Sequence, residues 1–90
     1  MKAFKKYYPI IKSSIITIET SKARSDERRN QMLLTSWNNI FNHLMESSKS
    51  NYDIAVYRAL YGMVNDKTCK LLTWDEMKKF VNSIMKGDIL

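Results

Sequence analysis

The chain has 90 residues, enough for one small domain over 1–90, and its 44% hydrophobic and 27% charged residues are typical of a globular protein. Two glycines and one proline are too few to turn a many-stranded sheet, and no apolar run reaches the ~18–20 residues that span a bilayer. The formal net charge is +6, and residues 1–30 hold eight basic against three acidic side chains. We therefore expect a helical domain with a basic N-terminal third and no transmembrane segment, whose charge favours an acidic partner.

The first predicted element covers residues 9–20 and is either a helix or a short strand. A proline suits the first position of a helix, and Ile11, Ile15 and Ile18 share one helical face. The many β-branched residues favour a strand instead, and the run Ile-Thr-Ile at 16–18 could alternate as a strand does. Because no other segment offers a pairing partner, we expect a helix.

The second predicted helix covers residues 25–47. Ser25 can cap it, and Asp26 and Glu27 in its first turn suit the positive end of the helix dipole. Five apolar residues recur at helical spacing and predict one buried stripe: Leu33, Trp37, Ile40, Phe41 and Leu44.

The third predicted helix covers residues 51–65, with Ser50 as its cap. Apolar residues occupy most of its circumference, so this helix is either central in the bundle or shares one face with a partner. Tyr57 and Tyr61 lie on its second apolar face, and tyrosine is common at binding hot spots. We therefore predict that Tyr57 and Tyr61 are exposed anchors for a partner.

The fourth predicted helix covers residues 74–86. Thr73 followed by Glu76 fits a capping box at its start, and Gly87 after Lys86 is a typical helix stop. The four segments together predict an all-α fold, a compact bundle of about four helices with short connections.

Catalytic and metal-binding constellations are missing from the sequence. His43 and Cys69 are the single histidine and cysteine, so no pair of such residues occurs at metal-ligand spacing. Gly62 and Gly87 are too far apart to form a phosphate-binding loop. We predict a non-enzymatic protein without cofactor or metal, and the lone cysteine favours the cytoplasm.

Basic side chains form the main candidate binding site. Four of them lie before or at the start of the second helix: Lys22, Arg24, Arg28 and Arg29. Arginine binds carboxylate or phosphate through paired hydrogen bonds, and positive charge at a helix start opposes the dipole, so stability alone gives little reason for this cluster. The last helix offers further phosphate contacts on its polar face: Lys78, Lys79 and Lys86.

These features favour a small accessory or inhibitor protein that binds and modulates a larger protein or protein–nucleic-acid machine, as proteins of phages and other mobile elements do. Direct nucleic-acid binding is the alternative, although the third helix offers few residues that could read bases. A membrane-surface protein of the immunity type is the third hypothesis, because lysines surround apolar residues in the N-terminal segment. A homodimer through the tyrosine-bearing face is compatible with each.

Overall fold

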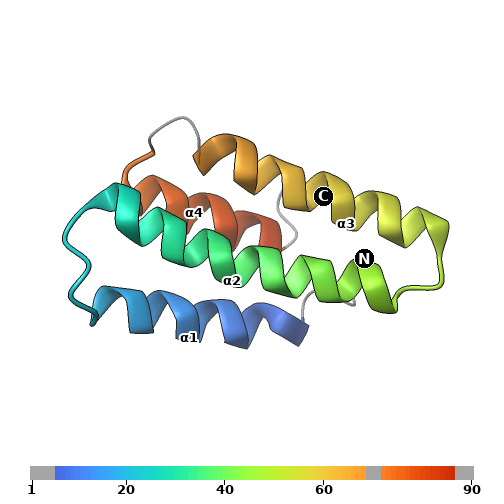
Figure 1. The fold of residues 1–90 in the computed structure, drawn as a ribbon, viewed down its shortest axis with the longest axis horizontal. Coiled ribbons are helices and arrows are strands. Elements are labelled where there is room, and N and C mark those ends of the chain that lie inside the picture. Colours follow the sequence, from blue (N-terminus) through green and yellow to red (C-terminus); the bar gives the residue numbers. More distant parts are fainter. Residues whose placement is uncertain (1–5, 69–71, 87–90) are drawn as a thin grey trace.

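The computed structural model describes residues 6–68 and 72–86, and this part of the chain forms four helices and no strand (Figure 1). They are α1 (Tyr8–Glu19), α2 (Asp26–Ser47), α3 (Asn51–Thr68) and α4 (Trp74–Met85). The predicted all-α bundle is therefore confirmed. The first segment is a helix, because its three buried isoleucines gain more from one shared face than their β-branched side chains lose in helix propensity.

Side-chain caps begin three of the four helices where the sequence predicts them. The Ser25 hydroxyl accepts the Arg28 N–H at the start of α2, and the Ser50 hydroxyl accepts the Asp53 N–H at the start of α3. The predicted capping box of α4 is complete, with the Glu76 carboxylate accepting a backbone N–H in return. These hydrogen bonds satisfy donors that a helix start leaves without an intrahelical partner.

Helix α3 continues to Thr68, three residues beyond its predicted end at 65. Asparagine often ends a helix because its amide competes for nearby backbone groups. Here the Asn65 amide donates to the Tyr61 carbonyl oxygen at 2.7 Å and to the Asn38 side-chain oxygen on α2 at 2.8 Å. Because the Asn65 amide is hydrogen-bonded within α3 and to α2, it does not compete for the backbone groups that follow, and the helix continues.

Helix α2 is the centre of the arrangement. It lies between α1 and α3 in Figure 1, and α4 packs against both α2 and α3. The molecule measures 40 × 24 × 22 Å along its principal axes, so its helices run along the long direction. Because α2 contacts every other helix, its apolar stripe supplies the middle of the core.

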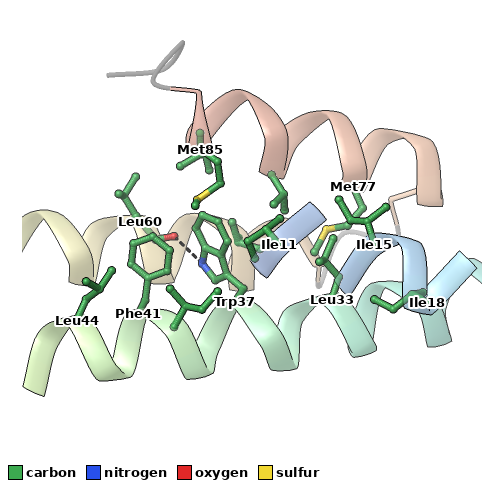
Figure 2. Close-up of a cluster of buried hydrophobic side chains, with 14 of the residues drawn as sticks. Ile11, Ile15, Ile18, Leu33, Trp37, Phe41, Leu44, Leu60, Met77 and Met85 are labelled. Carbon is green, nitrogen blue, oxygen red and sulfur yellow. Dashed lines mark hydrogen bonds between the residues drawn. The ribbon is translucent and has the colours of Figure 1, made fainter. Parts of the chain in front are cut away.

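The core contains side chains from all four helices, and Figure 2 shows them converging on Trp37. The Trp37 and Phe41 rings lie 4.3 Å apart between centroids, and the Tyr57 ring meets Phe41 edge-on at 6.2 Å. The Trp37 indole N–H donates to the carbonyl oxygen of Leu60 on α3 at 3.3 Å. This bond satisfies the one polar group of a side chain that has no exposed surface.

A buried asparagine fixes the segment that enters α4. Asn30 on α2 is 2% exposed, and its amide donates to the Leu72 carbonyl oxygen at 2.8 Å, across 42 residues of sequence. The sequence stripe does not predict this burial, because Asn30 precedes the apolar residues of α2. The contact holds Leu72, the residue before the N-cap of α4, against α2.

Candidate functional site

Hydroxyl groups hold the turn between α1 and α2. Ser21 Oγ donates to the Ile18 carbonyl oxygen at 2.6 Å and accepts the Ala23 N–H at 3.2 Å. Ser25 then caps α2 through the Arg28 N–H at 3.1 Å. These bonds fix the backbone on both sides of the turn, so its side chains project from a defined scaffold.

Three basic side chains surround one open groove at this turn, which we call the basic groove. All three are exposed: Lys22, Arg24 and Arg28. The half-buried side chains of Ala23 and Met32 add apolar surface to the groove, and Ser21 and Ser25 complete its lining. Arg28 and Met32 are four residues apart on α2, so they share one face of that helix.

The structure separates Arg29 from the other members of the predicted cluster. Its guanidinium lies 3.3 Å from the Asp26 carboxylate, one helical turn earlier, and it does not line the basic groove. The predicted cluster is thus brought together in part: Lys22, Arg24 and Arg28 share the groove, whereas Arg29 is engaged within α2. The i, i+3 spacing of Asp26 and Arg29 was the sequence signal for this pair.

Acidic residues of the same helical turn lie on the opposite side of α2. Asp26 and Glu27 line a separate cleft together with Asn30 and residues that precede α4. Within residues 6–68 and 72–86, Lys22, Arg24 and Arg28 make no ion pair. The basic groove therefore carries uncompensated positive charge, to which the nearby N-terminus of α2 adds its partial positive charge.

The chemistry of the basic groove is suited to binding anions. Two guanidinium groups and one ammonium group offer many N–H donors and no acceptor. Carboxylates and phosphates are the ligands that arginine binds through two parallel hydrogen bonds.

The three lysines predicted as phosphate contacts on α4 differ in their surroundings. Lys78 Nζ lies 2.9 Å from the Glu19 carboxylate of α1 and 3.3 Å from that of Asp75. The hydrogen bond between Lys78 and Glu19 raises the pKa of the lysine ammonium group and lowers the pKa of the glutamate carboxyl. Because two carboxylates neutralise the Lys78 ammonium group, we no longer propose Lys78 as a phosphate contact. Lys79 and Lys86 are exposed and stay predicted phosphate contacts.

The prediction that Tyr57 is an exposed anchor is wrong. Its side chain is 2% exposed and packs on Phe41, because the line Tyr57, Leu60 and Val64 is the face of α3 that turns to α2. Burial is the main cause that raises the pKa of the Tyr57 phenol, and the negative charge of nearby Asp53 raises it further. Tyr61 is half-buried against the core and remains a predicted contact.

The tyrosine that α3 exposes most is neither of the two predicted anchors. Tyr52, in the first turn of α3, is 74% exposed. Two apolar faces on one helix left the direction of packing open, and the neighbour α2 decides it. Tyr52 lies at the end of the molecule far from the basic groove, since α2 and α3 run between the two ends (Figure 1).

His43, one of the two residues considered for catalysis, lies apart from the basic groove. His43 is exposed near the end of α2, with the Tyr7 ring 6.3 Å away edge-on, while Cys69 lies outside the described residues. No group of three metal-ligating side chains occurs within residues 6–68 and 72–86. No helix in these ranges is long and apolar enough to cross a membrane.

Comparison with known protein families, with curated proteins and with solved structures finds no match to this chain. The basic groove is therefore assigned from its own geometry. Sequence reasoning found its three cations but missed Ser21 and Met32. The serine spacing around the turn and the i, i+4 spacing from Arg28 to Met32 were the signals available for them.

Proposed function

We propose that this chain is a non-enzymatic, cytoplasmic binding protein that docks through its basic groove onto an acidic surface of a larger protein and modulates that protein. The observation that carries the proposal is the juxtaposition of Lys22, Arg24 and Arg28, without described ion pairs, around a hydrogen-bonded turn. A turn that is already ordered reduces the entropy cost of binding. The cytoplasmic location is supported by the lone cysteine of the sequence.

The charge pattern favours protein carboxylates over a nucleic acid. Binding along a nucleic acid needs a stripe of cations that follows the phosphate backbone. The basic groove is short, and Asp26 and Glu27 lie across the same helical turn, where they repel a phosphate backbone that passes over it. Lys78 is neutralised by two carboxylates and does not extend the positive surface along α4.

Affinity capture from a nuclease-treated extract of the source cells tests the proposal with two matched double variants. The groove variant is Arg24→Gln/Arg28→Gln, and the control is Lys49→Gln/Arg58→Gln, which removes one exposed cation before α3 and one within it. We expect the wild type and the control to capture the same protein. The groove variant should bind it more than about tenfold more weakly, since charged hydrogen bonds are lost.

Two outcomes contradict the proposal. Capture that disappears after nuclease treatment assigns a nucleic acid as the partner, and equal capture by both variants places the binding surface elsewhere. Thermal unfolding serves as the folding control, because all four substituted side chains are exposed and both variants should unfold like the wild type.

A further inference from the structure

The basic groove continues into a second hollow between α1 and α2, because Met32 lines both. We call this second hollow the α1–α2 furrow. The two helices that form it lie side by side in Figure 1 and are joined by the turn that carries the basic groove. Residues from both helices line it: Pro9, Ile10, Ser13, Ser14, Thr17, Ile18, Met32 and Ser36.

Among the residues that the structure describes, no charged side chain lines the furrow, although 27% of the chain is charged. Ile10 is 49% exposed at its edge, and Met32 is half-buried. The remaining polar lining is small, with hydroxyls of Ser13, Ser14 and Ser36 in place of long side chains. Small side chains on two neighbouring helices let a third helix approach to the ~8–10 Å between axes that is usual in helix packing.

We propose that the furrow and the basic groove together bind an amphipathic helix of the partner protein. Its apolar face lies on Ile10 and Met32, and its acidic end reaches Arg24 and Arg28. This inference rests on the proposed function, because the acidic end of the helix is the acidic surface that the basic groove binds. It adds the secondary structure of the partner segment and its register.

The furrow walls favour a helix over an extended segment. Both walls are α-helices, whose backbone N–H and C=O groups bond within their own helix, so they offer no edge on which an extended peptide could pair. A helical ligand satisfies its own backbone and needs only side-chain contacts. The α1 part of the furrow, from Pro9 to Thr17, is ~12 Å long at 1.5 Å per residue, which corresponds to about two turns, and the basic groove extends it.

A bilayer surface is a poorer fit. Ile16 is 62% exposed but lies on the other flank of the exposed side of α1, where it borders a hollow shared with Asn82 of α4. A flat lipid surface resting on α1 engages Ile10 and Ile16 alike, whereas a helix in the furrow engages Ile10 alone. The two isoleucines, on one helix and both exposed, are thus a matched pair for the test.

The experiment selects ligands from a displayed library of random peptides of about 15 residues, long enough for four helical turns. The wild-type chain is the bait. We expect the enriched peptides to carry apolar residues at helical spacing and acidic residues at one end. Their affinities are then measured by fluorescence anisotropy against Ile10→Ser, Ile16→Ser and Arg24→Gln/Arg28→Gln.

The expected result is a loss of about tenfold or more in affinity for Ile10→Ser and for the arginine variant, with less than about a twofold change for Ile16→Ser. The selected peptides should also gain helical circular dichroism on binding. Both isoleucine variants replace exposed side chains, and their own circular dichroism verifies that they fold.

Each other outcome overturns a defined part of the proposal. Peptides that need the arginines but not Ile10 refute the furrow while leaving the proposed function standing, and peptides that need neither refute both. Failure to enrich any helical peptide also refutes the furrow. Binding of phosphatidylserine vesicles that Ile10→Ser and Ile16→Ser weaken equally assigns a membrane, and wild-type self-association lost in Ile10→Ser assigns a second copy of the chain.

Discussion

Trp37 joins α2 to α3 through a hydrogen bond from its indole N–H to the Leu60 carbonyl oxygen on α3, and its ring packs on Phe41 of its own helix. We expect Trp37→Ala to lower the free energy of unfolding by about 3–5 kcal/mol, because a large cavity opens where the side chain has no exposed surface. Urea unfolding measures the loss. Unchanged stability in this variant would contradict the core shown in Figure 2.

Gly62, within α3, has no close neighbour that explains its lack of a side chain. Apart from its chain neighbours and the adjacent backbone of α3, a Cβ added at this position meets no atom of the described residues within 4 Å. We expect Gly62→Ala to raise the free energy of unfolding by about 0.5–1 kcal/mol, since alanine loses less conformational entropy in a helix. A less stable Gly62→Ala protein, measured by urea unfolding, would indicate that the helix is distorted there.

The start of α4 depends on one hydroxyl. Thr73 Oγ1 accepts the Glu76 N–H at 3.1 Å, and the Glu76 carboxylate accepts the Thr73 N–H at 3.0 Å. We expect Thr73→Ala to cost about 1 kcal/mol of unfolding free energy, while Thr73→Ser, which keeps the acceptor, costs much less. Thermal unfolding of the two variants checks this, and equal losses would attribute the effect to the methyl group instead.

The ends of α1 and α4 are tied by the Glu19 carboxylate, which accepts bonds from Lys78 at 2.9 Å and from the Trp74 N–H at 3.4 Å. The hydrogen bond from Lys78 is the main cause that holds the pKa of Glu19 below its ordinary value of 4.5, and the bond from Trp74 lowers this pKa further. A carboxyl with a lowered folded-state pKa stabilises the protein above its unfolded pKa, and this stabilisation is lost as the pH falls through the folded value.

Urea midpoints measured from neutral pH down through the carboxyl range should therefore fall more for the wild type than for Glu19→Gln. The two curves should converge in acid. Glu46→Gln, which alters an exposed glutamate that makes no ion pair among the described residues, serves as the control and should follow the wild type. Parallel curves for Glu19→Gln and the wild type would mean that the α1–α4 tie adds no stability in solution.

The helices were predictable because their signals are local. Caps such as Ser25 and Thr73 and the stripe around Trp37 lie within single segments, and the structure confirms them. The exposure of Tyr57 was not predictable, since α3 carries apolar residues on two faces and only its contact with α2 selects one. The basic groove was predictable only in part. Its cations are adjacent in sequence, but Met32 joins them only after α2 folds beside the turn.

Over the whole molecule, the first turn of α2 separates charges of opposite sign. Arg28 faces the basic groove with Lys22 and Arg24, and Asp26 and Glu27 face the cleft on the other side. The net charge of +6 draws acidic partners in general, whereas this local separation orients them at the turn. Exchanging the positions of basic and acidic groups across α2 would keep the net charge but reverse that orientation.

The central position of α2 also has a consequence for partial unfolding. Because α2 contacts all three other helices, its amides become accessible to solvent only when the whole bundle opens, whereas α1, at one side of the bundle, can detach locally (Figure 1). We expect native-state hydrogen exchange to be slowest in the middle of α2 and faster in α1, and equal rates in both would mean that the bundle opens only as one unit. A ligand that contacts both α1 and α2 stabilises the attachment of α1, the helix that detaches most readily. Its binding should therefore slow hydrogen exchange more in α1 than in α2.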